Sequence, residues 1–224
     1  MTWISLFLAL FGPGVIALLW RRFASDRAGV AANAPWLGTF ILLLAGIAFI
    51  AAYGEGLELR EIGFEGTSWL SIPFGAALAL FFIFVFGPAA YWLLARIGLG
   101  SFEAGLASLA ALPRWHLGLT IIIVAAGEEW LYRGYAIERL EAMTGSGLLA
   151  GALSLAAFGI VHLPLWGIGA SLTTLISGGI MTALYLWQRD VAMLMLAHVL
   201  TDIYGLIIAQ PRQRPHKGGQ PPPD

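Results

Sequence analysis

Long runs of apolar residues, separated by short polar or Pro/Gly-containing segments, recur along nearly the whole chain. Each run has about the length that an α-helix needs to cross a bilayer, and the runs are continuous rather than alternating, as barrel strands would be. The pattern therefore predicts an all-α fold, a polytopic transmembrane helical bundle of about seven spans. The predicted spans are residues 3–20, 35–53, 69–95, 116–138, 147–163, 169–187 and 191–209.

The polar segments divide the chain into three regions. Residues 1–115 hold the N-terminal spans, residues 116–209 hold the spans that carry polar groups, and residues 210–224 form a Pro/Gly-rich tail predicted to be disordered. Between the second and third spans, "GEGLELREIGFEG" alternates acidic and apolar residues, which is typical of an interfacial strap and also of a solvated loop. The first span lacks a basic N-terminal region, so we expect it to stay uncleaved.

Basic residues predict the orientation of the spans. With seven spans and the N-terminus outside, eight of the 12 Lys and Arg residues lie on the inner side. The positive-inside rule therefore favours a cytoplasmic C-terminus.

Composition excludes several classes of function. The chain is 59% hydrophobic and 11% charged, whereas soluble domains are about 25% charged. The net charge of −1 gives no reason to expect nucleic acid as a partner. The chain has no Cys, which excludes disulfides, thiolate nucleophiles and cysteine-ligated metals.

A few ionisable residues lie inside the predicted spans instead of at their ends. Because such residues are costly in hydrocarbon, they mark a candidate site by default. The alternative is a buried ion network that only fixes how the helices pack. These residues are Glu128, Glu129, Arg133, His162, His198 and Asp202.

Helical spacing separates the two adjacent glutamates. Glu129 and Arg133 are spaced i, i+4 with the acid first, which is the better orientation for an ion pair within a helix. Glu128 lies about 100° around the helix and has no cation on its own face. We therefore expect Glu128 to be the reactive carboxylate and the Glu129–Arg133 pair to support it.

The two histidines lie on later spans. Phe158 precedes His162 by one helical turn, and Asp202 follows His198 by one turn, where a carboxylate can accept a bond from the ring and fix its tautomer. At about 1.5 Å of rise per residue, the polar groups of the three spans lie at compatible depths. We expect them to meet around a water-filled cavity.

A carboxylate and an imidazole that meet in this way can activate water for peptide hydrolysis, and a second imidazole can stabilise the oxyanion. Alternatively, Glu128, His162 and His198 could ligate a divalent metal such as zinc and leave one position open for water. The sequence leaves both mechanisms open. It has no H-E-x-x-H motif. A serine mechanism through Ser177 would leave both glutamates unexplained.

Three motifs in order, "EEWLYR", "FGIVH" and "HVLTD", match E-E-x-x-x-R, F-x-x-x-H and H-x-x-x-[N/D]. Over about residues 116–205 the chain resembles the CAAX prenyl endopeptidases and bacteriocin-processing enzymes, the CPBP or Abi family. The resemblance implies an intramembrane endopeptidase of a prokaryotic cytoplasmic membrane, acting on a peptide or lipidated protein within the bilayer. Non-catalytic scaffolding and bacteriocin self-immunity are the alternatives that it also implies. A proton-coupled transporter is disfavoured because no inverted repeat is evident.

The resemblance also implies a role for each matching residue. Glu128 and His162 would activate the water, while His198 and Asp202 would form the oxyanion side. Glu129 and Arg133 would support the site, and Phe158 would pack beside it. In the prenyl-protease branch of the family, the motif residue that matches position 202 is Asn. An ionised Asp cannot donate a bond to an oxyanion, so Asp202 must be protonated or must instead orient His198.

Overall fold

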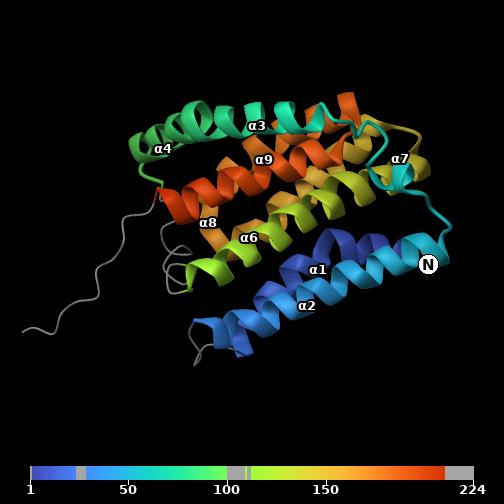
Figure 1. Ribbon diagram of the computed structural model, residues 1–224, viewed down its shortest axis with the longest axis horizontal. Coiled ribbons are helices and arrows are strands. Elements are labelled where there is room, and N and C mark those ends of the chain that lie inside the picture. Colours follow the sequence, from blue (N-terminus) through green and yellow to red (C-terminus); the bar gives the residue numbers. More distant parts are fainter. Residues whose placement is uncertain (1, 24–28, 100–108, 110–111, 210–224) are drawn as a thin grey trace, which may run out of the picture.

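The computed structural model of the protein describes residues 2–23, 29–99, 109 and 112–209 (Figure 1). These residues form helices and connecting segments with no strand, and the predicted all-α fold class is confirmed. The predicted disordered tail, 210–224, lies outside the described residues. The elements are α1 (Thr2–Phe23), α2 (Val30–Phe49), η1 (Ile50–Gly54), η2 (Leu59–Ile62), α3 (Ser71–Phe81), η3 (Phe82–Phe86), α4 (Gly87–Arg96), α6 (Arg114–Glu129), η4 (Trp130–Ile137), α7 (Glu138–Thr144), α8 (Gly147–Gln188), α9 (Val191–Ile203) and η5 (Tyr204–Ile208).

Several α-helices continue without a break into wider π-helical turns. The π-helices η1, η3, η4 and η5 follow α2, α3, α6 and α9 directly. The longest of them, η4, begins at the residue after the adjacent glutamates. Since π-turns are rare and occur often at functional sites, this position agrees with a site near Glu128 and Glu129.

The expected number of about seven spans is not confirmed, because only five helices among the described residues are long and apolar enough to cross a membrane. They are Thr2–Phe23, Val30–Gly54, Ser71–Arg96, Gly147–Gln188 and Val191–Ile208. The continuous helix made by α6 and η4, predicted as the span 116–138, is absent from this set. It is long enough, but Glu128, Glu129 and Arg133 reduce its apolar character.

The other difference in span number concerns α8, which covers two predicted spans. Gly167 interrupts its helical backbone with φ 81° and ψ 176°, within the predicted "LPLWGIG" connection. The two halves then pack side by side in opposite directions. A Cβ atom on Gly151 would lie 3.0 Å from Leu186, and one on Gly159 would lie 2.4 Å from Leu175. These glycines let the two halves of α8 approach closely.

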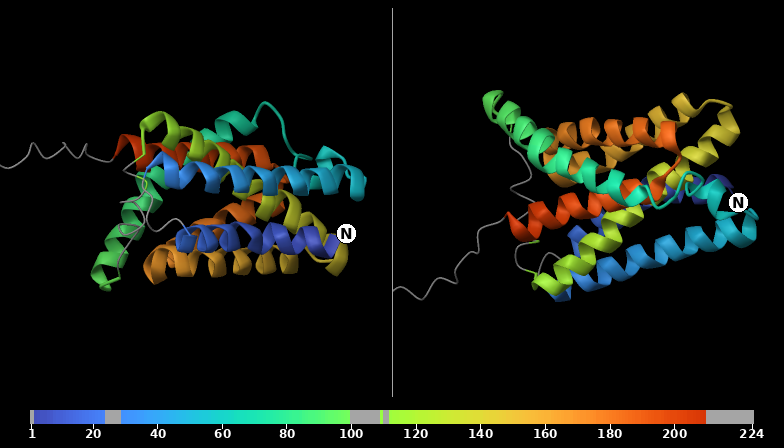
Figure 2. Two further views of the ribbon diagram at one scale, coloured as in Figure 1. Left: turned by 90° about the horizontal axis from the view of Figure 1, so that it is seen from below. Right: turned by 45° about the horizontal axis from the view of Figure 1, so that its top comes forward.

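The segment α6–η4 lies at the centre of the bundle. It packs against α1, α2, α8 and α9, and α9 in turn lies between α3 and α6 (Figures 1 and 2). In η4, Leu131, Tyr132, Tyr135 and Ala136 are each at most 1% exposed. The charged residues at the junction of α6 and η4 are therefore held next to the most deeply buried turns of the described residues.

The segment between η1 and α3, expected to be a strap or a solvated loop, packs against this central helix. Its 3-10 helix, η2, begins with a capping box formed by Glu58 and Glu61. The carbonyl oxygen of Gly63 accepts a hydrogen bond of 2.9 Å from the backbone of Val191, and Arg189 accepts one of 2.9 Å from Gly66. The segment 54–66, called the strap below, is thus fixed between η4 and the start of α9.

A substitution at Gly63 tests the packing of the strap against η4. Its φ of +104° is unfavourable for other residues, and a Cβ atom there would lie 2.4 Å from the Cα of Gly134. We expect Gly63→Ala to lower the free energy of unfolding by about 2–4 kcal/mol, through backbone strain and overpacking together. Thermal unfolding of the purified protein in detergent measures this effect.

Gly56→Ala is the matched control. Gly56 also has a positive φ, +69°, but a Cβ atom there would meet nothing within 4 Å. We expect a smaller loss, from backbone strain alone. Equal losses in the two variants would contradict the close approach of the strap to η4.

Candidate active site

Glu129, the last residue of α6, is completely buried and bonds to two partners. Its Oε1 accepts a hydrogen bond of 2.9 Å from the guanidinium of Arg133 and another of 2.9 Å from Nδ1 of His198. Its Oε2 is buried and has no hydrogen-bond partner among the described residues. Glu129 therefore joins the central helix to α9 through a single carboxylate oxygen.

Arg133 joins the same helix to α8. Its side chain is 1% exposed, and it donates 3.2 Å to the carbonyl oxygen of Gly178 and 3.4 Å to the hydroxyl of Thr182. Its guanidinium carbon lies 4.5 Å from the ring centroid of Phe158. The i, i+4 pair of Glu129 and Arg133 forms as the spacing predicts. Each of the three guanidinium nitrogens of Arg133 donates to one described partner.

His162, in the first half of α8, is oriented by the residue one turn before it. Its Nδ1 lies 2.7 Å from the carbonyl oxygen of Phe158, and the two rings have centroids 4.4 Å apart. Because a carbonyl oxygen can only accept, Nδ1 carries the proton in this bond. In the neutral ring, Nε2 then has a free lone pair, as an acceptor of a proton from water requires.

His198 lies between two carboxylates. Its Nδ1 bonds to Glu129, while its Nε2 lies 3.7 Å from Oδ2 of Asp202, beyond hydrogen-bond distance. The side chain of Asp202 is 38% exposed and that of His198 is 20% exposed. The expectation that Asp202 accepts the bond that fixes His198 is therefore not met, because Glu129 from another helix is the closer partner.

Glu128 differs from its neighbour, as expected. It is partly buried, and its carboxylate forms no hydrogen bond or ion pair with a described residue. It lies within electrostatic range of His198, Asp202 and Arg133. Its oxygens are thus free to bind a ligand close to the group of charged side chains.

The structure brings the predicted residues together from three helices. A chain of direct contacts runs from Asp202 through His198, Glu129 and Arg133 to Phe158. His162 joins at the Phe158 end and lies within electrostatic range of His198. Glu128 lies beside this chain and has no direct bond to His162 in the described residues.

The sequence suggested Glu128, His162 and His198 as a possible metal-binding set. In the described part of the chain, no group of three or more His, Asp or Glu side chains is placed to hold a metal ion. Glu128, His162 and His198 form no such group, and both histidines use Nδ1 for other bonds, so only their Nε2 atoms are left for a ligand. The same geometry leaves the carboxylate of Glu128 and both Nε2 atoms available for acid–base chemistry.

Sequence reasoning missed the partners that α8 supplies. Gly178 and Thr182 are spaced i, i+4, so both face Arg133. A Cβ atom on Gly178 would lie 2.8 Å from the guanidinium, which explains a glycine there. In addition, Ser154 donates 2.7 Å to the carbonyl oxygen of Tyr132. Small or hydroxyl residues at helical spacing within an apolar span are the signal that could have identified these positions.

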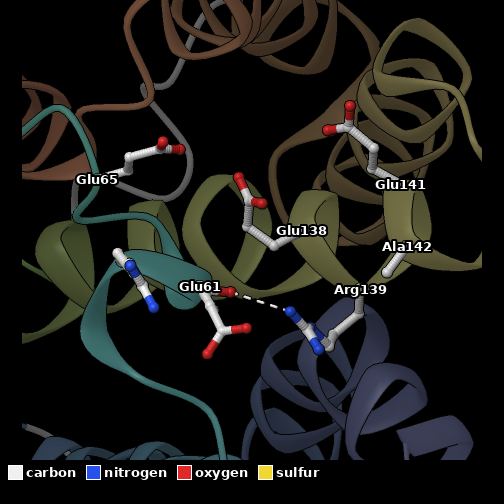
Figure 3. Close-up of a pocket in the computed structure, with 7 residues that line it drawn as sticks. Glu61, Glu65, Glu138, Arg139, Glu141 and Ala142 are labelled. Atoms are coloured by element: carbon white, nitrogen blue, oxygen red, sulfur yellow. Dashed lines mark hydrogen bonds between the residues drawn. The ribbon is translucent and has the colours of Figure 1, made fainter.

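A surface pocket of about 440 Å³ lies elsewhere, between the strap and α7 (Figure 3). None of the predicted site residues lines it. At its edge, Arg139 donates 3.1 Å to the carbonyl oxygen of Glu61. Nearby, Arg189 bonds Glu138 at 2.8 Å and Glu141 at 2.6 Å. The bond to Glu141, ahead of the one to Glu138, raises the pKa of Arg189, so this arginine remains charged.

Comparison with known protein families matches the segment of the chain that holds these residues. Residues 110–204, somewhat under half of the chain, match the family model of the type II CAAX prenyl endopeptidase Rce1-like proteins. The family resemblance inferred from the motifs is therefore confirmed for this segment, which contains every predicted site residue. Together with the five apolar helices, the match supports an integral membrane peptidase of the CAAX type. No curated protein and no solved structure matches the chain.

Proposed function

We propose that the chain, whose residues 110–204 are Rce1-like, is an intramembrane endopeptidase that hydrolyses a peptide bond in a membrane-associated substrate. The observation that carries this proposal is the convergence of Glu128 and two histidines near the buried ion pair of Glu129 and Arg133. The substrate would be a prenylated protein or a bacteriocin-type peptide. The membrane would be a prokaryotic cytoplasmic membrane, with the C-terminus on the cytoplasmic side.

The first step is attack of water on the scissile carbonyl carbon. Glu128 and Nε2 of His162 hold the water, and Glu128 takes its proton as the new C–O bond forms. The free carboxylate of Glu128 supports this role, because none of its lone pairs is engaged by another described residue. The carbonyl π bond opens and its electron pair moves to the oxygen, which becomes the oxyanion.

The second step is collapse of the tetrahedral intermediate. In this proposal, Nε2–H of His198 in its doubly protonated form and the protonated carboxyl group of Asp202 donate to the oxyanion and stabilise the charge while it exists. Glu128 then returns the proton to the leaving nitrogen as the C–N bond breaks. The products are a carboxylic acid and an amine, and no redox partner or cofactor is needed to balance the reaction.

His162→Ala and His198→Ala test the two imidazoles separately. We expect each change to lower the turnover of a membrane peptide by about 10²–10⁴-fold, because each removes a positioned proton-transfer or electrostatic group. The measurement uses purified protein reconstituted in vesicles with a cleavable peptide. Full turnover in either variant would contradict the role assigned to that histidine.

Metal analysis of the same reconstituted protein addresses the alternative mechanism. One result would favour the metal-dependent mechanism over the metal-free one: a stoichiometric divalent metal, with turnover that is lost on chelation and returns when zinc is added. Turnover that resists chelation would support the metal-free mechanism.

A further inference from the structure

The hydrogen bond between Glu129 and His198 determines which ring nitrogen of His198 carries a proton. The distance from Oε1 to Nδ1 is 2.9 Å, and the same oxygen is bonded to the guanidinium of Arg133. A carboxylate paired with an arginine has no proton to donate. Nδ1 must therefore be the donor, and the free nitrogen of His198 is Nε2.

Glu129 is held more firmly than any other partner of His198. Its side chain is 0% exposed, and Arg133, which binds it, is itself fixed by the carbonyl oxygen of Gly178 and the ring of Phe158. Asp202, in contrast, is 38% exposed and lies 3.7 Å from the ring on the same helix. The orientation of the imidazole is thus determined across helices by a buried carboxylate.

We propose that Glu129 is a positioning residue, which holds His198 through Nδ1–H and presents Nε2 to the reacting carbonyl. This assignment rests on the proposed peptidase function and deepens it. The role goes beyond bracing the helix, and it moves the orienting function from Asp202 to Glu129. Whenever the reaction needs a donor or an acceptor from His198, the atom concerned is Nε2.

A carboxylate that binds one nitrogen of a histidine fixes both its tautomer and its ring plane. An amide in the same place can accept or donate, so it no longer selects one tautomer. Glu129→Gln therefore keeps the side-chain volume and removes the selection. Asp202→Asn makes the same chemical change on the other side of the ring and is the matched control.

NMR of protein in detergent, with its histidines labelled with a heavy nitrogen isotope, reads the tautomer directly. The chain has only four histidines, and the signal of His198 is the one that disappears in His198→Gln. At a pH where the ring is neutral, we expect the Nδ1–H form in the wild type and in Asp202→Asn. We expect a mixture with the Nε2–H form in Glu129→Gln.

A kinetic measurement adds a second readout. In Glu129→Gln we expect kcat for the membrane peptide to fall by about 10²-fold or more, with little change in KM, as when carboxylates that orient catalytic histidines are replaced. Asp202→Asn should retain the wild-type tautomer whatever its effect on kcat.

Three outcomes would overturn the proposal: an Nε2–H ring in the wild type, an unchanged tautomer in Glu129→Gln, or loss of the Nδ1–H form in Asp202→Asn. The wild-type spectrum alone decides the first, even if Glu129→Gln does not fold. The NMR arm requires no substrate, so an inactive protein with the expected tautomer would contradict the peptidase function and not the role of Glu129.

Discussion

Glu128→Gln is expected to lower kcat for a membrane peptide by about 10²–10⁴-fold, the usual contribution of a positioned general base. Glutamine keeps the shape of the side chain but has no basic carboxylate to take the proton of water. Because Glu128 makes no hydrogen bond or ion pair with a described residue, the change should leave the fold and KM nearly unaltered. Steady-state kinetics and thermal unfolding of the reconstituted protein measure the two effects.

The matched control for this variant is Glu65→Gln. Glu65 is an exposed acid of the strap and lines the surface pocket beside α7. We expect wild-type kcat and KM from it. Undiminished turnover in Glu128→Gln would disprove the general-base role.

Arg133→Ala is expected to reduce the free energy of unfolding by about 3–5 kcal/mol, as when one partner of a buried ion pair is removed. The change leaves the fully buried carboxylate of Glu129 without its cation. It also removes the donor to the carbonyl oxygen of Gly178 and the cation over the ring of Phe158. Denaturant or thermal unfolding in detergent measures the loss.

Thr182→Val is the control for Arg133→Ala. It removes only the 3.4 Å contact to the guanidinium nitrogen Nε and keeps the ion pair intact. We expect a loss of about 1 kcal/mol. If Arg133→Ala unfolds like the wild type, Glu129 is compensated by another group or by water, and the ion pair is not what stabilises this helix.

The parts of the site that lie within one helix could be predicted from spacing. Glu129 and Arg133 pair because they are four residues apart, and Glu128, one residue earlier, faces another direction. The same reasoning placed Phe158 beside His162. Such relations depend only on the repeat of the helix, which the apolar pattern already indicates.

Relations between helices could not be obtained in this way. The bond from Glu129 to His198 joins residues separated by 69 positions, and spacing on α9 suggested Asp202 as the partner instead. Which of two carboxylates reaches the ring depends on how α6 and α9 pack. That packing is determined by the buried side chains of many residues together.

The number of spans illustrates a second limit. Apolar length predicted one span at 116–138, but the charges of Glu128, Glu129 and Arg133 make this segment too polar to count by composition. The charges of Glu129 and Arg133 are compensated by each other and by contacts with α8 and α9. A helix that carries charges can therefore lie at the centre of the bundle although its own composition is too polar to count as a span.

The contacts of the central helix with α1 have a consequence for how the protein is made. Tyr132 donates 2.9 Å to the carbonyl oxygen of Leu10, and Tyr135 donates 2.7 Å to the hydroxyl of Ser5. Since a chain emerges from the ribosome N-terminus first, α1 and α2 are synthesised before α6 and η4. Helix α1 thus offers hydrogen-bond acceptors to a helix whose charges disfavour insertion on its own. The polar bonds of that helix to α8 and α9 can form only after those helices are synthesised, so the site is completed by elements that follow its glutamates in the chain.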